Sequence, residues 1–160
     1  MELFRIAREK YAEDLSGTGS YLYPGRWHHE GTYLIYTASN RSLAQLEYLV
    51  HVSIPHLPAD LRIITLWAPD DAIQDLDTEE FPAGWDRLRP VRGTRDLGSK
   101  WAEEHTSLGL AVPSAVSRGE HNVILNPLHD RMSEVRLVRM EPLTYDERIR
   151  KLVENARSGA

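Results

Sequence analysis

The sequence predicts one α+β domain with a mostly antiparallel, split sheet and flanking helices. Strand-like and helix-like segments are intermixed along the chain, without the regular alternation of a doubly wound sheet. The 160 residues, 41% apolar and 27% charged, suit a single globular domain over residues 1–160. The sequence has neither a Gly-x-Gly-x-x-Gly motif nor a Walker loop, so a Rossmann or P-loop nucleotide site is not expected.

The first third of the chain predicts two strands, a loop and a helix. Residues 3–7 form a short apolar run and predict an edge strand, whereas the glycine-rich residues 16–25 predict a loop. Residues 33–37 are aromatic and β-branched, which is typical of a strand. Ser39 is the expected N-cap of a helix that extends to about Val52.

The remaining elements follow the same patterns. Residues 61–68 predict a buried strand, and the acidic residues 69–90 predict a solvated connection with one short helix at most. Further strands are expected at residues 108–112, 123–125 and 135–140, and further helices at residues 94–105 and 144–157. Thr144 and Glu147 have the spacing of a capping box at the start of the last helix.

Composition narrows the class of protein. The net charge of −5 gives no sign of the basic face that a nucleic-acid-binding protein normally has. No apolar run approaches the ~20 residues that span a bilayer, and the first residues lack the layout of a signal peptide. The absence of cysteine excludes thiolate chemistry and suits a cytoplasmic protein. The seven histidines lack metal-ligand spacing, so no metal is expected.

Glu47 is the first of three candidate functional residues. Leu43, Leu46 and Val50 recur at helical spacing, and Glu47 lies between Leu43 and Val50 on the side expected to face inward. A carboxylate in that position is costly to desolvate unless a partner compensates it. The pattern by itself favours the ordinary explanation, in which Glu47 lies at the edge of the apolar stripe and extends to water.

Arg26 and Ser114 are the other two candidates. Arg26 follows a tight proline–glycine turn and could hold a phosphate through its planar guanidinium, although a surface Arg stacked on Trp27 explains the sequence as well. Ser114 follows Pro113 at the end of a predicted strand, where its hydroxyl could contact a ligand. A serine bonded to local backbone is the commoner case.

Several short motifs occur in a fixed order along the chain. They are Gly25-Arg26-Trp27, Gly31, Leu34-Ile35-Tyr36-Thr37, Leu43-Ala44-Gln45-Leu46-Glu47, Trp101, Val112-Pro113-Ser114-Ala115-Val116 and Ile124-Leu125-Asn126-Pro127. Over residues 4–140 this set resembles the RES domain family, which is named for an arginine, a glutamate and a serine. Those residues correspond to Arg26, Glu47 and Ser114. The family often has Asn after its Arg-Trp pair, where this sequence has His28.

The resemblance implies a fold similar to that of ADP-ribosyltransferase toxins and a role as the toxin of a toxin–antitoxin pair. The implied activity is consumption of NAD, by attack of water or phosphate at the nicotinamide ribose or by transfer of ADP-ribose to a protein. The implied partner is an Xre-like helix-turn-helix antitoxin that fills the cleft of the toxin in a hetero-oligomer.

A mechanism follows from this resemblance. Cleavage of the nicotinamide–ribose bond builds positive charge on the sugar, which a carboxylate stabilises. Glu47 would supply that carboxylate, and Arg26 would hold the pyrophosphate. Tyr36 would stack on the nicotinamide ring, Ser114 would orient it, and Asn126 would shape the same cleft. Because nicotinamide leaves as a neutral molecule, the reaction requires neither a metal nor a strong acid.

Two other functions stay open from the sequence. A non-enzymatic module could dock a basic partner through the acidic residues 70–80, although such a charge run is usually a solvated face. A ribonuclease toxin is disfavoured by the acidic pI and by the absence of a basic, aromatic groove.

Overall fold

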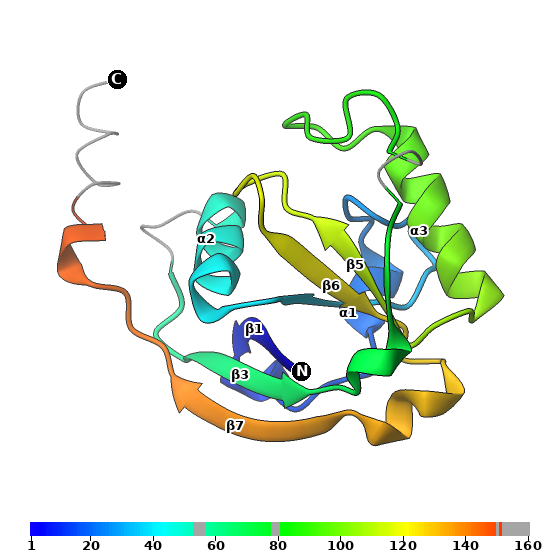
Figure 1. The fold of residues 1–160 in the computed structure, drawn as a ribbon. Helices are drawn as coiled ribbons and strands as arrows, with labels where there is room; N and C mark the ends of the chain where they lie inside the picture. The colour runs from blue at the N-terminus through cyan, green and yellow to red at the C-terminus, as the bar shows by residue number, and fades with distance from the viewer. Residues whose placement is uncertain (53–56, 78–80, 150, 152–160) are drawn as a thin grey trace.

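The computed structural model describes residues 1–52, 57–77, 81–149 and 151. Within these ranges one mixed sheet has the strand order β4-β5-β6-β2-β1-β3-β7 (Figure 1). The strands are β1 (Glu2–Arg8), β2 (Ile35–Ala38), β3 (Leu61–Trp67), β4 (Ile73–Asp75), β5 (Gly109–Pro113), β6 (His121–Leu125) and β7 (Arg136–Pro142). β4 is parallel to β5, and the other neighbouring strands are antiparallel. The predicted α+β class with a mostly antiparallel sheet is confirmed.

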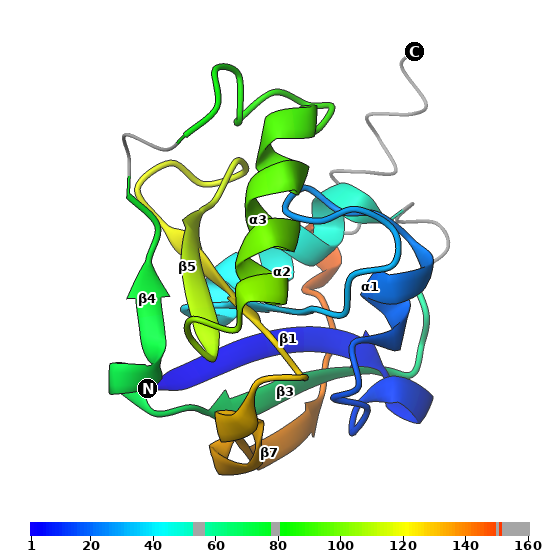
Figure 2. The ribbon, with the colours of Figure 1, turned by 90° about the vertical axis from the view of Figure 1, so that its right-hand side faces the viewer.

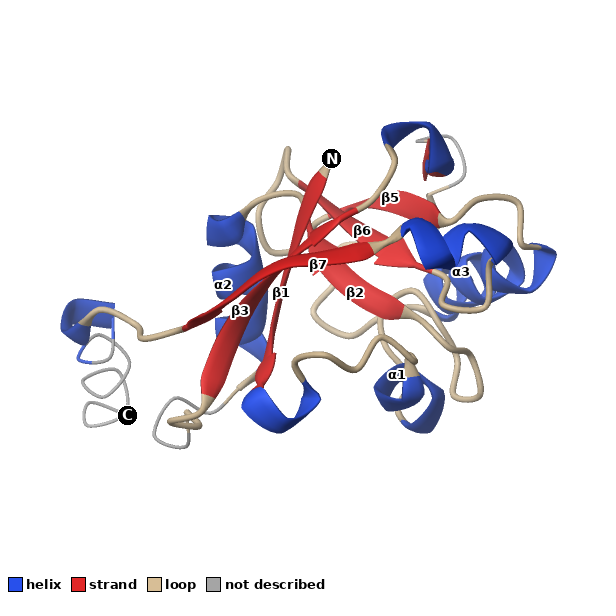
Figure 3. Ribbon diagram, turned by 90° about the horizontal axis from the view of Figure 1, so that it is seen from below, coloured by secondary structure: helices blue, strands red, loops and turns tan. Residues whose placement is uncertain are grey.

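The sheet divides between β1 and β2. These two strands pair at Phe4 and Ala38, whereas β1 pairs with β3 along its whole length. One half of the sheet therefore contains β4, β5, β6 and β2, and the other contains β1, β3 and β7 (Figure 3). Buried side chains from both halves form a common core: Leu3, Ile64, Leu66, Ile35, Val123 and Leu125. Burying each such aliphatic side chain stabilises the fold by about 1.5–3 kcal/mol.

Three described helices accompany the sheet, and the second and third pack on the same face with β2 between them. They are α1 (Thr18–Leu22), α2 (Arg41–His51) and α3 (Arg92–Glu104), with 3-10 turns at Glu9–Tyr11, Asp70–Ala72 and Asp130–Glu134. Leu43 of α2 packs in one cluster with Ala38, and Trp101 of α3 packs in another with Tyr36. The two helices themselves lie apart from each other (Figures 1 and 2). Tyr36 and Ala38 are two residues apart on β2 and so share a face. The interval between α2 and α3 therefore lies over β2. No described helix has the length and apolarity that a bilayer crossing requires.

The predicted apolar stripe of α2 is partly wrong. Leu43 is buried, but Leu46 and Val50 are 40% and 52% exposed. The helix packs against β1 and β2 through Leu43 and its neighbour Ala44, which rotates Leu46 and Val50 outward. Glu47 lies one turn after Leu43 and Ala44, on the packed side of the helix, and is half-buried.

Three further expectations for the chain are corrected. The strand predicted at the sheet edge is β1, which lies between β2 and β3 because Leu3 contributes to the central core. The segment 16–25, predicted as loop, contains α1, which Gly17 precedes in the left-handed conformation with φ of 74°. The connection predicted over residues 69–90 contains β4, which pairs with β5.

Two helix caps also differ from the prediction. Asn40 caps α2 in place of Ser39, because Asn40 Oδ1 accepts a 2.8 Å hydrogen bond from the backbone N–H of Leu43. In the last helix, Asp146 Oδ1 accepts from the backbone N–H of Arg148 at 2.8 Å, so Asp146 takes the place predicted for Thr144. Of the predicted helix 144–157, residues 147–149 and 151 are helical, and 150 and 152–157 lie outside the described residues.

Candidate functional site

A cleft of about 630 Å³ opens where the sheet divides. This volume suits a ligand of drug or cofactor size. Its walls come from β1 and β2, from α2, from the loop after α1, from α3 and from residues 81–90. The predicted residues that line the cleft are Arg26, Tyr36 and Glu47. The division of the sheet thus brings three distant segments of the chain to one cavity.

Glu47 is held by one of its two carboxylate oxygens. The Oγ of Ser114 donates to Oε1 at 2.7 Å, and Nδ2 of Asn122 donates to the same oxygen at 2.6 Å. Among the described residues, no donor contacts Oε2. One oxygen is therefore positioned by two protein donors, and the other is available to a molecule in the cleft. The partner that a carboxylate on the packed side of α2 requires is this pair of donors.

Ser114 lies behind Glu47 and is 1% exposed. Its Oγ accepts from the backbone N–H groups of Val116 at 3.1 Å and Ser117 at 3.0 Å. A hydroxyl has two acceptor lone pairs and one proton, and the proton goes to Glu47. The ordinary interpretation of Ser114 holds, since its hydroxyl binds local backbone, and its proton also orients the carboxylate of Glu47. Its predicted contact with a ligand stays a prediction.

Arg26 is fixed by residues 81–90, which form another wall of the cleft. Its Nη1 donates to the carbonyl oxygens of Trp85 at 2.7 Å and Arg87 at 2.9 Å. Trp27 is buried and its ring lies 6.4 Å from that of Trp85. The segment that carries Arg26 is thus attached to residues 81–90 through both its charged and its aromatic side chain.

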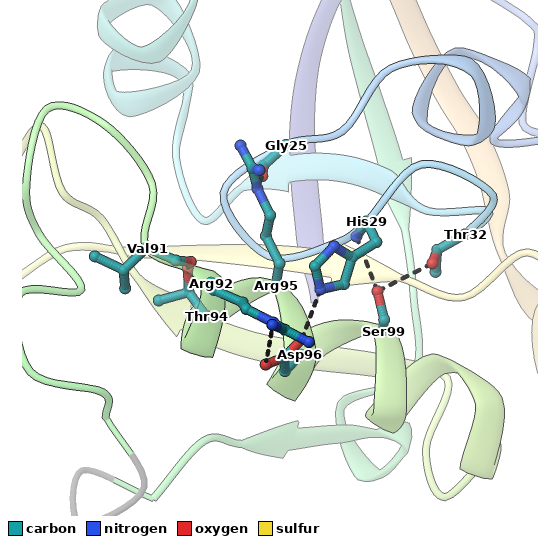
Figure 4. Close-up of polar contacts among 9 residues, drawn as sticks. All are labelled: Gly25, His29, Thr32, Val91, Arg92, Thr94, Arg95, Asp96 and Ser99. Carbon is teal, nitrogen blue, oxygen red and sulfur yellow. Dashed lines mark hydrogen bonds and ion pairs between the residues drawn. The ribbon is translucent and has the colours of Figure 1, made fainter.

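The same segment is seated closely on α3. A Cβ on Gly98 would lie 1.9 Å from the backbone oxygen of Trp27, so this position of the helix requires glycine. In the next position, Ser99 Oγ accepts from the backbone N–H of His29 at 2.9 Å and lies 3.0 Å from the hydroxyl of Thr32 (Figure 4). Two small residues of α3 therefore determine where the Arg26 segment lies.

Tyr36 lines the cleft while its hydroxyl contacts the protein. The hydroxyl accepts from the backbone N–H of Trp27 at 3.1 Å and lies 2.8 Å from Nδ1 of His28. Nε2 of His28 faces the carbonyl oxygens of Ser20 at 2.9 Å and Tyr23 at 3.0 Å, so Nε2 carries a proton. The other ring nitrogen of neutral His28, Nδ1, therefore accepts a hydrogen bond from the hydroxyl of Tyr36. Burial raises the pKa of Tyr36 and lowers the pKa of His28, which keeps both groups neutral. His28 therefore orients the hydroxyl of Tyr36 and holds the backbone at Ser20 and Tyr23.

Asn126 is the one predicted site residue whose side chain neither lines the cleft nor hydrogen-bonds to a residue that does. It is buried after β6, where its Nδ2 donates to the carbonyl oxygen of Ala102 at 2.8 Å and its Oδ1 accepts from the N–H of Leu128 at 3.0 Å. These contacts connect the end of α3 to the sheet. Asn126 does not line the cleft.

Sequence reasoning missed two cleft residues that hydrogen-bond to Glu47 or to the residue before Arg26. Asn122 lies immediately before the predicted strand 123–125, and Arg95 lies on the predicted helix 94–105. Neither belongs to a motif of the sequence. Their contacts are with residues more than 65 positions away, which a local sequence pattern does not reveal. The described residues contain no group of three or more His, Asp or Glu side chains arranged to hold a metal ion.

The fold matches a chain in the crystal structure of the M. tuberculosis MbcT-MbcA toxin–antitoxin complex. The TM-score is 0.72 with 20% sequence identity, over 98% of this chain and 88% of that chain. The two chains therefore share one α+β fold. The family model described as "RES domain" matches residues 2–146, and the chain belongs to the RES domain family.

Curated relatives support the same family. The chain is 44% identical over 129 residues to a protein named Toxin Res from Photorhabdus laumondii, covering 80% of this chain and 83% of the relative. It is 36% identical to Toxin Res of Yersinia enterocolitica, covering 91% and 95%. It is 34% identical to the Prs ADP-ribosylating toxin of Sphingobium, covering 89% and 91%.

Proposed function

We propose that this protein is the toxin of a toxin–antitoxin pair and consumes NAD by breaking the bond between nicotinamide and ribose. The observation that carries the proposal is the geometry of Glu47, whose Oε1 is held by Ser114 and Asn122. A carboxylate with one fixed oxygen and one unoccupied oxygen at a cleft is prepared to stabilise a cation. The names of the curated relatives, all toxins, support the biological role.

The chemistry requires little beyond that carboxylate. As the bond from ribose C1′ to nicotinamide breaks, the electron pair leaves with neutral nicotinamide and positive charge develops on the sugar. Oε2 of Glu47 stabilises this charge electrostatically, and an oxygen of water or phosphate then bonds to C1′ and loses its proton. Because Oε1 is already bound, the carboxylate needs no reorganisation during the reaction.

Arg26 and Tyr36 would bind the substrate. Arg26 would contact the pyrophosphate, because its guanidinium is anchored through Nη1 and so is oriented before the ligand arrives. Tyr36 would stack on the nicotinamide ring, since its hydroxyl is held by Trp27 and His28 and its position is therefore fixed. Ser114 would act through Glu47 as a positioning residue.

A second candidate reaction is transfer of ADP-ribose to a protein side chain. The name of the Sphingobium relative, 34% identical, favours it. The cleft chemistry is the same in both reactions, and the acceptor distinguishes them. A non-enzymatic binding module is the alternative that lacks any turnover.

We infer that the partner is an antitoxin of the Xre-like helix-turn-helix class that covers the cleft in a hetero-oligomer. The matched fold comes from a toxin–antitoxin complex, which supports this inference. We also propose that the protein acts in the cytoplasm. Consumption of NAD inside the cell would be toxic without secretion or membrane attachment.

The test is incubation of the purified protein with labelled NAD in phosphate buffer and in phosphate-free buffer. Free ADP-ribose indicates hydrolysis, a phosphorylated ribose product indicates phosphorolysis, and labelled protein indicates transfer. Unchanged NAD under all conditions, including incubation with cell extract, would contradict the proposal.

The variant that tests the charge of the Glu47 carboxylate is Glu47→Gln. Its amide oxygen can still accept the hydrogen bonds of Ser114 and Asn122, so the change removes the charge and keeps the shape. We expect turnover to fall by roughly 10²–10³ fold, the loss typical of removing one preorganised electrostatic group, with a smaller change in KM. Glu103→Gln, on the exposed surface of α3, is the control and should keep full activity.

Expression in a host tests the biological role. Induction of the wild-type chain alone should stop growth and lower cellular NAD, whereas Glu47→Gln should do neither. A co-expressed helix-turn-helix partner from the neighbouring gene should restore both. Normal growth and normal NAD with soluble wild-type protein would refute the toxin assignment.

A further inference from the structure

Arg95 is a cleft residue with no assigned role. It lies on α3 beside Asp96, but the two side chains diverge. Asp96 pairs with His29 at 2.7 Å and with Arg92 at 3.5 Å, whereas Arg95 extends the other way and donates from Nε to the carbonyl oxygen of Gly25 at 2.9 Å (Figure 4). Arg95 therefore contacts the residue immediately before Arg26.

The guanidinium groups of Arg26 and Arg95 are each held through one of their three nitrogens. A guanidinium has five N–H donors. Arg95 uses its Nε–H on Gly25, and Arg26 uses both hydrogens of Nη1 on Trp85 and Arg87. Within the described ranges, the two Nη groups of Arg95 and the Nε and Nη2 of Arg26 have no acceptor. Neither residue has a carboxylate within 4.0 Å among those residues.

The two groups act on the same part of the cleft. Both Arg26 and Arg95 line it, and the charges of both lower the pKa of Tyr36, against the larger effect of burial, which raises it. Glu47 is the single carboxylate among the described residues that line the cleft. The cleft thus has a cationic end with anchored donors that face no protein anion.

We propose that Arg95 is a second anion-binding residue which, with Arg26, forms a cradle for the diphosphate of a dinucleotide. This proposal deepens the proposed function, on which it rests, by assigning the diphosphate a two-arginine site. A diphosphate has two charged groups a few ångströms apart, and each can accept paired N–H donors from one guanidinium. Because the anchors hold both groups before binding, less conformational entropy is lost when the ligand arrives.

Titration calorimetry on the purified protein tests the cradle with three probes: inorganic pyrophosphate, ADP-ribose and nicotinamide. In Arg95→Gln we expect the affinities for pyrophosphate and ADP-ribose to fall at least about tenfold, as for loss of one charge-assisted contact. The affinity for nicotinamide should change less than about twofold, because it carries no phosphate. Arg92→Gln, one turn earlier on α3 and paired with Asp96, is the matched control and should bind all three like the wild type.

A purely structural role for Arg95 predicts a different result. If Arg95 served to hold Gly25, its loss would displace the segment of Arg26 and Trp27, and nicotinamide affinity would fall together with that of the anions. The dependence of ADP-ribose affinity on salt separates the two roles further, because a lost phosphate contact weakens that dependence. Arg95→Lys keeps a positive charge without the planar fork, and should recover part of the affinity and of the salt dependence.

The outcomes distinguish this proposal from the proposed function. ADP-ribose binding that depends on Arg95, in a protein that leaves NAD intact, would support the cradle and refute NAD consumption. NAD consumption with pyrophosphate and ADP-ribose affinities that are unchanged in Arg95→Gln would refute the cradle alone. Equal losses for nicotinamide and for the two anionic probes would also refute it.

Discussion

Asn122 donates from Nδ2 to Oε1 of Glu47 at 2.6 Å and so connects β6 to α2 across the cleft. The contact joins residues 75 positions apart in the sequence. It is also one of the two bonds that leave Oε2 of Glu47 as the oxygen available to a ligand. The position of the carboxylate therefore depends on a residue that belongs to no recognised motif of the sequence.

The first prediction concerns this contact. Replacing Asn122 with Ala removes a charge-assisted hydrogen bond and lets the carboxylate rotate, so we expect kcat for NAD consumption to fall about tenfold. KM should change less, because the ground-state sugar carries little charge. His121→Ala, the exposed neighbour on β6, should leave kcat unchanged. An Asn122→Ala variant with wild-type kcat would show that Glu47 does not need this donor.

The second prediction concerns the anchor of Arg26. Lysine keeps the charge but cannot donate to the carbonyl oxygens of Trp85 and Arg87 through a planar fork. Arg26→Lys should therefore lose most activity, and amide hydrogen exchange should be faster in residues 81–90. Arg89→Lys, an exposed change in the same loop, should alter neither measurement. Near wild-type turnover in Arg26→Lys would argue against an anion-binding guanidinium.

The third prediction concerns the contact between α3 and the Arg26 segment. Gly98→Ala places a methyl group against the backbone oxygen of Trp27, which cannot move aside as a flexible side chain would. We expect the free energy of unfolding to fall by about 1–3 kcal/mol, with a loss of activity as Arg26 is displaced. In Gly19→Ala, by contrast, the methyl group meets nothing within 4 Å, so stability should be kept or improved by up to about 1 kcal/mol. Chemical denaturation of both variants measures the difference.

The fourth prediction concerns pH. Burial lowers the pKa of His28 below its ordinary 6.5, so the unfolded chain takes up a proton that the folded protein does not. The contribution of His28 is therefore fully present above pH 6.5 and declines as the pH falls below it, by at most about 1.4 kcal/mol per pH unit for one proton. Thermal melts between pH 7.5 and 5 should show a steeper decline in the wild type than in His28→Asn. Parallel declines would exclude His28 as the cause.

Local pattern was sufficient for most of the secondary structure. Residues 61–68 and 94–105 are close to β3 and α3, because an apolar run and a helical repeat depend on neighbours in the sequence. The placement of β1 was not predictable in this way. A short apolar run fits an edge or an interior position equally, and the pairing of β1 with β3 on one side and β2 on the other decides between them.

The sequence by itself determined the class of fold, the family and the three residues for which the family is named, because these depend on residue types and their order. The tertiary structure alone decided how they act together. It divides the sheet at Phe4 and Ala38, gives Glu47 two donors, and turns Ser114 toward that carboxylate rather than into the cleft. It also brings Arg95 beside Gly25, 70 positions away. The physical reason is that hydrogen bonds and ion contacts act over a few ångströms, and only the folded chain brings residues so distant in sequence within that range.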